Sequence, residues 1–158
     1  MANLDDQKLK IWEKTIDVQM HFNNIELQIR NYALTLFTAV IAGIGYLLKE
    51  KFNILIMGYI IPSSAAAALI GMIIMCVFYF MDKYWYHQLL KGSVSHAIKI
   101  ENFAHAHDPL LNLTNEIGAS SKIKLIGWEL DSNKKYYFFY YPLILVFFVL
   151  YLALLKWA

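Results

Sequence analysis

The chain has 158 residues, of which 59% are apolar and 16% are charged, with a formal net charge of +2. A soluble globular domain has roughly 45–50% apolar and about 25% charged residues, so this composition argues against a soluble domain and indicates a membrane protein. The small net charge also argues against a nucleic-acid-binding protein, and no direct nucleic-acid binding is expected.

The N-terminal segment, residues 1–31, is polar and amphipathic. Residues 5–30 contain neither Gly nor Pro. One row of apolar residues recurs at helical spacing: Ile11, Val18, Phe22, Ile25 and Ile29. No stop signal separates this segment from the apolar stretch that follows, so we predict one helix from about Asp5 to Leu48.

Three segments are apolar enough to be transmembrane helices, since a span needs ~20 mainly apolar residues. They are residues 32–48, 62–82 and 136–156. Residues 49–61 are predicted to be a short extracytoplasmic loop, with 54–61 as an interfacial or re-entrant approach. Apart from Asp82 and Lys156 at their ends, the spans contain no charged residue or His. Ion-coupled transport and intramembrane proteolysis need such groups within the bilayer, so both are disfavoured.

The two proline residues near the second and third spans set where those helices begin. Pro62 suits the first turn of a helix, where its missing N–H costs nothing, and Ser63 and Ser64 could serve the free amides. Pro142 is expected to bend the third span near its start or to mark where its regular helix begins.

Positive charges are expected to fix the orientation, because cytoplasmic loops carry an excess of Lys and Arg. Eleven lie on the side of the N-terminus: Lys8, Lys10, Lys14, Arg30, Lys83, Lys91, Lys99, Lys122, Lys124, Lys134 and Lys135. Three lie on the other side: Lys49, Lys51 and Lys156. The sequence therefore predicts a multi-pass protein of the cell inner membrane with a cytoplasmic N-terminus.

The second helix is predicted to continue beyond the membrane, from about Pro62 to His107, with residues 83–108 as a cytoplasmic extension. Residues 109–135 form a cytoplasmic connector, with a short helix ending at Gly118 and then a short strand or surface segment. The predicted fold class is all-α: an integral membrane protein with three transmembrane helices, the first two continuing as long cytoplasmic amphipathic helices.

A short connection makes the first two helices antiparallel. Placing Asn31 and Asp82 at one membrane face aligns residues of mostly complementary charge. The predicted neighbours are Arg30 with Asp82 or Lys83, Glu26 with His87, Asp17 with His96, and Glu101 with Lys10 and Lys14.

Small residues recur every fourth position on both helices. The two stripes are Thr35, Ala39, Gly43 and Ser63, Ala67, Gly71. Helices in lipid associate where small residues allow close approach. We therefore predict that the stripes meet, either within a protomer or between protomers.

Aromatic and basic residues mark the predicted membrane interface. The candidates are Lys83, Tyr84, Trp85, Tyr86 and Trp157, since such side chains favour the headgroup region. Asp82 and His87 lie close by, but residues five apart are about 140° apart around an α-helix, so they cannot form a catalytic dyad on their own.

Polar residues next to the membrane are candidates for facing a ligand or a partner: His21, Asn24, Glu26, Arg30, His87 and His96. The alternative for them is a solvated face with salt bridges to the second helix. Glu101 and His105 have a spacing that could chelate a divalent metal, but a solvated helix end is favoured because no further ligand motif accompanies them. No metal, cofactor or catalytic residue is predicted, and the protein is not expected to be an enzyme.

The helix "KIWEKTIDVQMHFNNIELQIRN" leads into a charge-free span, and "YFMDKYWYHQLL" leaves the next one. This layout resembles the small multi-pass membrane effectors of prokaryotic antiviral defence systems. The resemblance implies a homo-oligomer in contact with membrane lipids, which receives a cytoplasmic protein or small ligand and changes membrane permeability, as an effector or pore-forming subunit. The alternative is a non-enzymatic anchor or scaffold that recruits a soluble partner protein.

Overall fold

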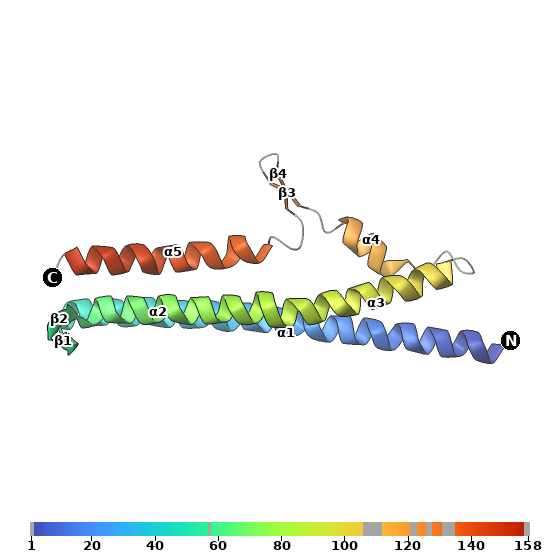
Figure 1. Ribbon diagram of the computed structural model, residues 1–158, viewed down its shortest axis with the longest axis horizontal. Helices are drawn as coiled ribbons and strands as arrows, with labels where there is room; N and C mark the ends of the chain where they lie inside the picture. The colour runs from blue at the N-terminus through green and yellow to red at the C-terminus, as the bar shows by residue number, and fades with distance from the viewer. Residues whose placement is uncertain are drawn as a thin grey trace. The chain divides into compact units, whose positions relative to one another are not determined.

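The computed structural model describes residues 2–56, 58–105, 112–120, 123–125, 128–130 and 135–156 (Figure 1). Apart from two short hairpins, these residues are helical. The elements, in chain order, are α1 (Ala2–Glu50), β1 (Asn53–Ile56), β2 (Tyr59–Pro62), α2 (Ser63–Phe80), the π-helix η1 (Met81–Tyr86), α3 (His87–His105), α4 (Leu113–Ser120), β3 (Ile123–Leu125), β4 (Trp128–Leu130) and α5 (Lys135–Lys156).

The predicted first helix is confirmed as α1, an uninterrupted helix of 49 residues. It ends where Lys51 adopts a positive φ of 53° and donates its backbone N–H to the carbonyl of Leu47. A left-handed residue just past the last turn is a common way for a helix to end, because it redirects the chain while satisfying a terminal carbonyl.

Two antiparallel strands, Asn53–Ile56 and Tyr59–Pro62, form a hairpin in the segment predicted to be an interfacial or re-entrant approach. The register pairs Asn53 with Pro62 and Ile56 with Tyr59, and Gly58 between the strands has a φ of 86°. The physical reason is local: apolar β-branched residues on both sides of a Gly that tolerates positive φ favour a tight hairpin over a helix.

The second helical run is also continuous, from Ser63 through η1 to His105. Pro62 is the N-cap of α2 and makes no side-chain capping hydrogen bond. The backbone N–H of Ser63 instead donates to the carbonyl of Phe52, which joins the start of α2 to the hairpin. In the third span, Pro142 lies inside α5, so the prediction that the regular helix begins at this proline is wrong.

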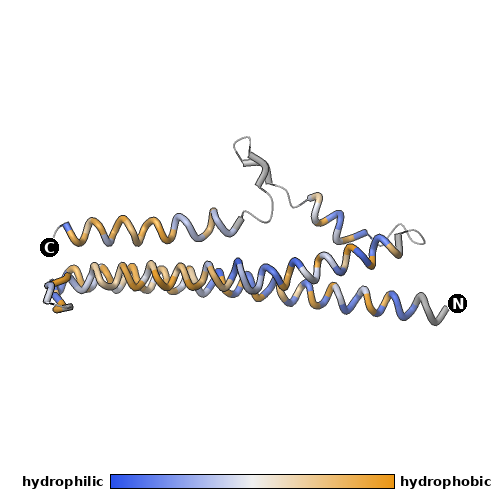
Figure 2. Tube along the Cα trace, in the orientation of Figure 1, coloured by the Kyte–Doolittle hydropathy of each residue, from blue (hydrophilic) through white to orange (hydrophobic). Residues whose placement is uncertain are grey.

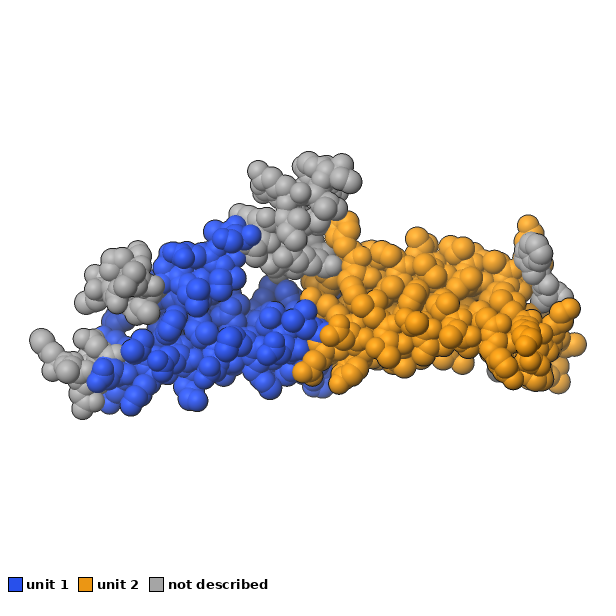
Figure 3. All heavy atoms as spheres, turned by 180° about the vertical axis from the view of Figure 1, so that it is seen from behind, with its two compact units in different colours: residues 1–27, 83–135 blue, residues 28–82, 136–158 orange. Residues whose placement is uncertain are grey.

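The chain divides into two compact units, coloured separately in Figure 3. Unit 2 comprises residues 28–82 and 136–158 and contains parts of α1, α2 and α5. Its core is made of buried residues from all three helices: Ala33, Ile44, Ala68, Met75, Tyr136, Tyr140 and Phe147. In Figure 2 the Cα trace is coloured mostly as hydrophobic along α2 and over much of α5.

Three helical stretches are long and apolar enough to cross a membrane: Asp6–Glu50, Ser63–Phe103 and Tyr136–Lys156. Between 11% and 28% of the residues in their most apolar windows are buried inside the protein. Most of this apolar surface is therefore not covered by the protomer itself, as is typical of a multi-pass membrane protein.

Unit 1 comprises residues 1–27 and 83–135. Within it α4 lies against α3, and β3 pairs with β4 in an antiparallel hairpin, Ile123 opposite Leu130. The short helix predicted to end at Gly118 is confirmed as α4 and ends two residues later.

Candidate functional site

The most specific polar contact in unit 2 joins α1 to the start of η1. Arg30 donates from Nε to Oδ2 of Asp82 at 2.7 Å and from Nη2 to Oδ1 at 3.2 Å. Asp82 is fully buried. A bidentate guanidinium–carboxylate pair is strong and geometrically specific, so it fixes the register between the two helices. The predicted neighbourhood of Arg30 and Asp82 is confirmed.

A second buried pair lies in unit 1. Nδ1 of His87 is 3.0 Å from Oε1 of Glu26, and both side chains are almost completely buried. This predicted pairing is also confirmed. Glu26, Arg30 and His87 were candidates to face a ligand, but the structure uses all three in contacts between helices.

The π-helix explains how Asp82 and His87 can both reach α1. The predicted separation of about 140° assumes α-helical geometry. In a π-helix the hydrogen bonds join residues five apart, so residues at this spacing return to nearly the same side. Because η1 spans Met81–Tyr86, the α-helical geometry assumed for that separation does not apply here, while Asp82 and His87 have separate partners, Arg30 and Glu26. Single π turns are frequent at functional positions in helices.

Glu101 is the centre of a third buried cluster, within unit 1. It is fully buried and accepts a hydrogen bond from Nε1 of Trp12 at 3.2 Å. On its other side it accepts bonds from Thr114, at 3.0 Å from the backbone N–H and 2.6 Å from the hydroxyl. A carboxylate at the first turn of α4 satisfies an otherwise unpaired amide and interacts favourably with the helix dipole.

Sequence reasoning missed this role for Glu101, which was predicted to lie near Lys10 and Lys14. The available signal was the helix start "LTNE", whose first amides need an acceptor. The side chain of His105, the other half of the metal spacing, lies outside the described residues. Among the described residues, no three His, Cys, Asp or Glu side chains come together in an arrangement that could hold a metal ion.

The three remaining ligand-facing candidates are exposed. These are His21, Asn24 and His96. His96 lines a shallow cavity of about 430 Å³ together with Lys10 and Lys14. The structure therefore separates the six candidates into three residues in buried pairs and three on the surface.

The two small-residue stripes do not meet within the protomer. Gly71 is buried, but a Cβ at this position would lie 2.8 Å from the ring of Phe147 and 2.9 Å from Val40. The close neighbours of Gly71 are thus Phe147 of α5 and Val40 of α1, and neither belongs to the predicted stripes. Thr35, Ala39 and Gly43 are exposed, and a Cβ on Gly43 would have no neighbouring atom within 4 Å among the described residues.

The predicted interface residues lie on η1, and two of them are largely exposed. Tyr84 and Trp85 are on the surface, with Nζ of Lys83 4.6 Å from the centre of the Tyr84 ring. The rings of Trp85 and Tyr86 are stacked, with centroids 6.2 Å apart. Trp157 lies outside the described residues.

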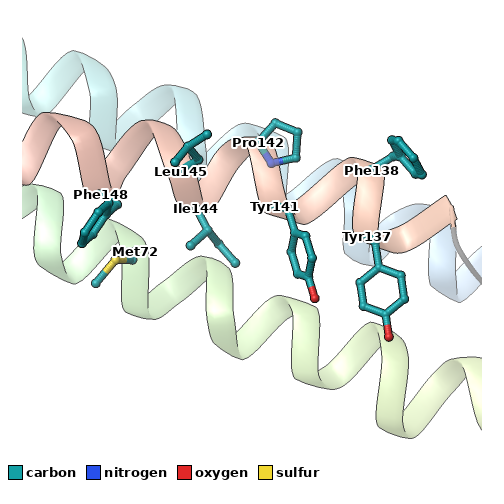
Figure 4. Close-up of a pocket in the computed structure, with 8 residues that line it drawn as sticks. All are labelled: Met72, Tyr137, Phe138, Tyr141, Pro142, Ile144, Leu145 and Phe148. Carbon is teal, nitrogen blue, oxygen red and sulfur yellow. The ribbon is translucent and has the colours of Figure 1, made fainter.

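An apolar groove of about 790 Å³ lies between α2 and α5, inside unit 2 (Figure 4). Its lining residues are Met72, Tyr137, Phe138, Tyr141, Pro142, Ile144, Leu145 and Phe148. Next to it, Tyr79 of α2 contacts four tyrosine rings at the start of α5, at centroid distances from 5.8 to 6.2 Å. The lining of the groove is apolar, and sequence reasoning did not identify it.

Three buried polar clusters thus join helices within the two units: one on Asp82 in unit 2, and those on His87 and Glu101 in unit 1. Apolar faces and the face of Thr35, Ala39 and Gly43 are left exposed.

Comparisons of this chain with protein-family models, with curated proteins and with solved structures found no match.

Proposed function

We propose that this protein is an oligomeric, non-enzymatic membrane effector that couples a cytoplasmic partner or ligand to membrane permeability. Unit 2 would lie in the inner membrane as a multi-pass bundle, and unit 1 would lie in the cytoplasm with the N-terminus.

The observation that carries the proposal is an exposed apolar surface on the part of α1 that belongs to unit 1. Ile11 and Met20 are 53% and 55% exposed, although charged residues surround them along the helix. Other large apolar residues of unit 1 are also exposed: Leu9, Val18, Leu27, Leu89 and Phe103. Soluble surfaces rarely leave this much apolar area uncovered, so contact with another copy or with a partner protein is favoured.

The exposed face of Thr35, Ala39 and Gly43 supports self-association in the membrane. Small residues let helix backbones approach closely, and close approach is the main source of helix association in lipid. Because this face is not used within the protomer, it is available to a second copy. The contact between protomers would then use the face of Thr35, Ala39 and Gly43, because Gly71 is buried against Phe147 and Val40 of its own protomer.

Helix continuity supports the coupling part of the proposal. α1 is one uninterrupted helix from Ala2 to Glu50, so its segment in unit 1 and its segment in unit 2 belong to the same helix. In the second run the π-helix η1 is the proposed adjustment point, since π turns within α-helices are frequent at functional sites. We infer from the resemblance to antiviral effectors that the signal arises in antiviral defence.

A specific observation favours the second candidate, a membrane anchor that recruits a soluble partner. The hydroxyls of Thr35 and Thr38 donate to the carbonyls of Asn31 and Leu34 at 2.9 Å. These hydroxyls are satisfied by their own helix and need neither water nor ions, which fits a helix that faces lipid and does not line a pore.

A membrane-potential dye in expressing cells separates the two candidates. The effector proposal predicts depolarisation on expression with the native genetic neighbours and loss of depolarisation in a Gly43→Leu variant. A stable membrane potential, together with co-purification of a stoichiometric soluble protein, would support the anchor instead. Retained depolarisation after Ala replacement of His96, His105 and His107 is also expected, because no histidine chemistry is invoked; His87 is left in place because it pairs with the buried Glu26.

A further inference from the structure

Unit 1 contains a cavity of about 800 Å³ between α1, α3 and α4. Its size is within the range of small-molecule sites, roughly 300–1,000 Å³. None of the buried polar clusters described above fills it, although His87 and Thr114 line its wall.

Helix α3 presents two adjacent rows of side chains to this cavity. One row is polar and basic, with a residue at every fourth position: His87, Lys91, Ser95 and Lys99. The other row is apolar: Leu90, Val94 and Ile98. Residues at this spacing lie one above another on a helix, so the cavity has an apolar strip beside a basic strip.

The basic strip lacks a matching carboxylate in the cavity wall. Lys91 and Lys99 are exposed, and neither has an ion-pair partner among the described residues. The two nearby acids are already used: Glu26 is paired with His87, and Glu101 is fully buried against Thr114. The cavity wall is therefore complementary to negative charge.

One polar atom in the wall is left without a partner inside the protein. Oε1 of Gln19 is shielded from solvent and has no hydrogen-bond partner among the described residues. A buried acceptor in this state is costly, so a ligand that brings an N–H or O–H group would gain by donating to it.

We propose that this cavity binds an amphipathic organic anion: a carboxylate, phosphate or sulfonate joined to an apolar body that carries one hydrogen-bond donor. The anion lies between Lys91 and Lys99, the apolar body lies along Leu90, Val94 and Ile98, and the donor reaches Gln19. A bound ligand would join α4 to α1 and α3. This assignment names the ligand class for the proposed function. It rests on that function only for the idea that the ligand acts as the signal.

The experiment compares two fluorescent probes on the full-length protein in detergent, after subtraction of protein-free micelles. One probe, 8-anilinonaphthalene-1-sulfonate, has an anion, an N–H donor and an apolar body. The other, N-phenyl-1-naphthylamine, lacks the sulfonate. The test variant is Lys91→Gln/Lys99→Gln, and Lys49→Gln/Lys51→Gln is a charge-matched control outside unit 1. Lys91→Arg/Lys99→Arg keeps the charge and controls for folding.

The expected result is at least tenfold weaker binding of the sulfonate probe to Lys91→Gln/Lys99→Gln, because one charge-assisted hydrogen bond alone corresponds to about a factor of ten. The arginine variant and the Lys49/Lys51 control should bind within threefold of the unaltered protein, and the uncharged probe should not distinguish any of them. Equal binding of the sulfonate probe by the glutamine variant and the unaltered protein would overturn the proposal. So would an equal loss in the Lys49/Lys51 control.

Two competitors then identify the source of the anion. Displacement of the probe by lysophosphatidic acid assigns the site to a lipid, and displacement by indole-3-acetate alone assigns it to a water-soluble compound. Displacement by neither overturns the assignment. Binding is measured apart from permeability, so probe binding without any change in liposome leakage would leave the cavity assignment standing and contradict the proposed signalling role.

Discussion

Asp82 is fully buried, whereas the Arg30 side chain that pairs with it is 23% exposed. The pair therefore combines an acid with no access to solvent and a base that keeps part of its hydration. Breaking a buried pair by removing one partner is far more damaging than losing a surface pair, because the remaining charge is left without compensation.

Asp82→Ala should lower the free energy of unfolding by about 3 kcal/mol, at the lower end of the range for buried pairs because Arg30 is partly exposed. Denaturant titration in detergent measures the change. The matched control is Asp17→Ala, whose partner Lys14 lies 3.8 Å away with side chains 85% and 61% exposed. That substitution should cost less than about 0.5 kcal/mol. Similar losses in both variants would contradict the role given to Asp82.

Gly71→Ala should destabilise the bundle of unit 2. The added Cβ would lie 2.8 Å from the Phe147 ring, so either the ring or a helix must move, at a typical cost of about 1–3 kcal/mol. Phe147→Leu in the same chain should recover part of the loss by removing the ring. No loss of thermal stability in Gly71→Ala, or no recovery in the double variant, would argue against this close approach.

Gly43→Leu should leave the stability of the protomer unchanged and reduce the oligomer. A Cβ at this position meets no atom within 4 Å among the described residues, so we expect the larger side chain to act on a neighbouring copy. Size-exclusion chromatography with light scattering measures the oligomer. An exposed residue on the same helix provides the control, Leu36→Ala. An unchanged mass for Gly43→Leu contradicts the proposed protomer contact.

Thr114→Val should loosen α4 from the rest of unit 1, because it removes the 2.6 Å hydrogen bond to Glu101 and leaves a buried carboxylate under-satisfied. Hydrogen exchange of the amides of residues 113–120 should accelerate about tenfold, which corresponds to about 1.4 kcal/mol. Thr38→Val is the control, since that hydroxyl bonds only its own helix. Unchanged protection of α4 would show that the hydroxyl bond from Thr114 to Glu101 does not hold it.

Much of the architecture could be predicted from the sequence because it depends on one-dimensional patterns. The length of α1 follows from the absence of Gly and Pro between residues 5 and 30, and the three spans follow from uncharged apolar runs. Placing the first two helices antiparallel, with Asn31 and Asp82 at the same membrane face, was enough to predict the pairs Arg30–Asp82 and Glu26–His87.

The features that were missed depend on three-dimensional context. The π-helix Met81–Tyr86 has more residues per turn than an α-helix, and the spacing of apolar residues in the sequence does not reveal this change. The partner of Gly71 is Phe147, on a helix 76 positions away, and no local signal connects the two. Glu101 was interpreted from its neighbour His105, whereas its partners are Trp12 and Thr114.

The central claim is that lipid surrounds the three apolar helices, and spin-label accessibility in liposomes tests it most directly. Single cysteines would replace the exposed residues Ile73 of α2, Val149 of α5 and Glu13 of α1, in a chain carrying Cys76→Ser. Labels at Ile73 and Val149 should collide readily with oxygen and rarely with a water-soluble nickel chelate, and the label at Glu13 should show the reverse. Equal nickel accessibility at all three positions would contradict the account.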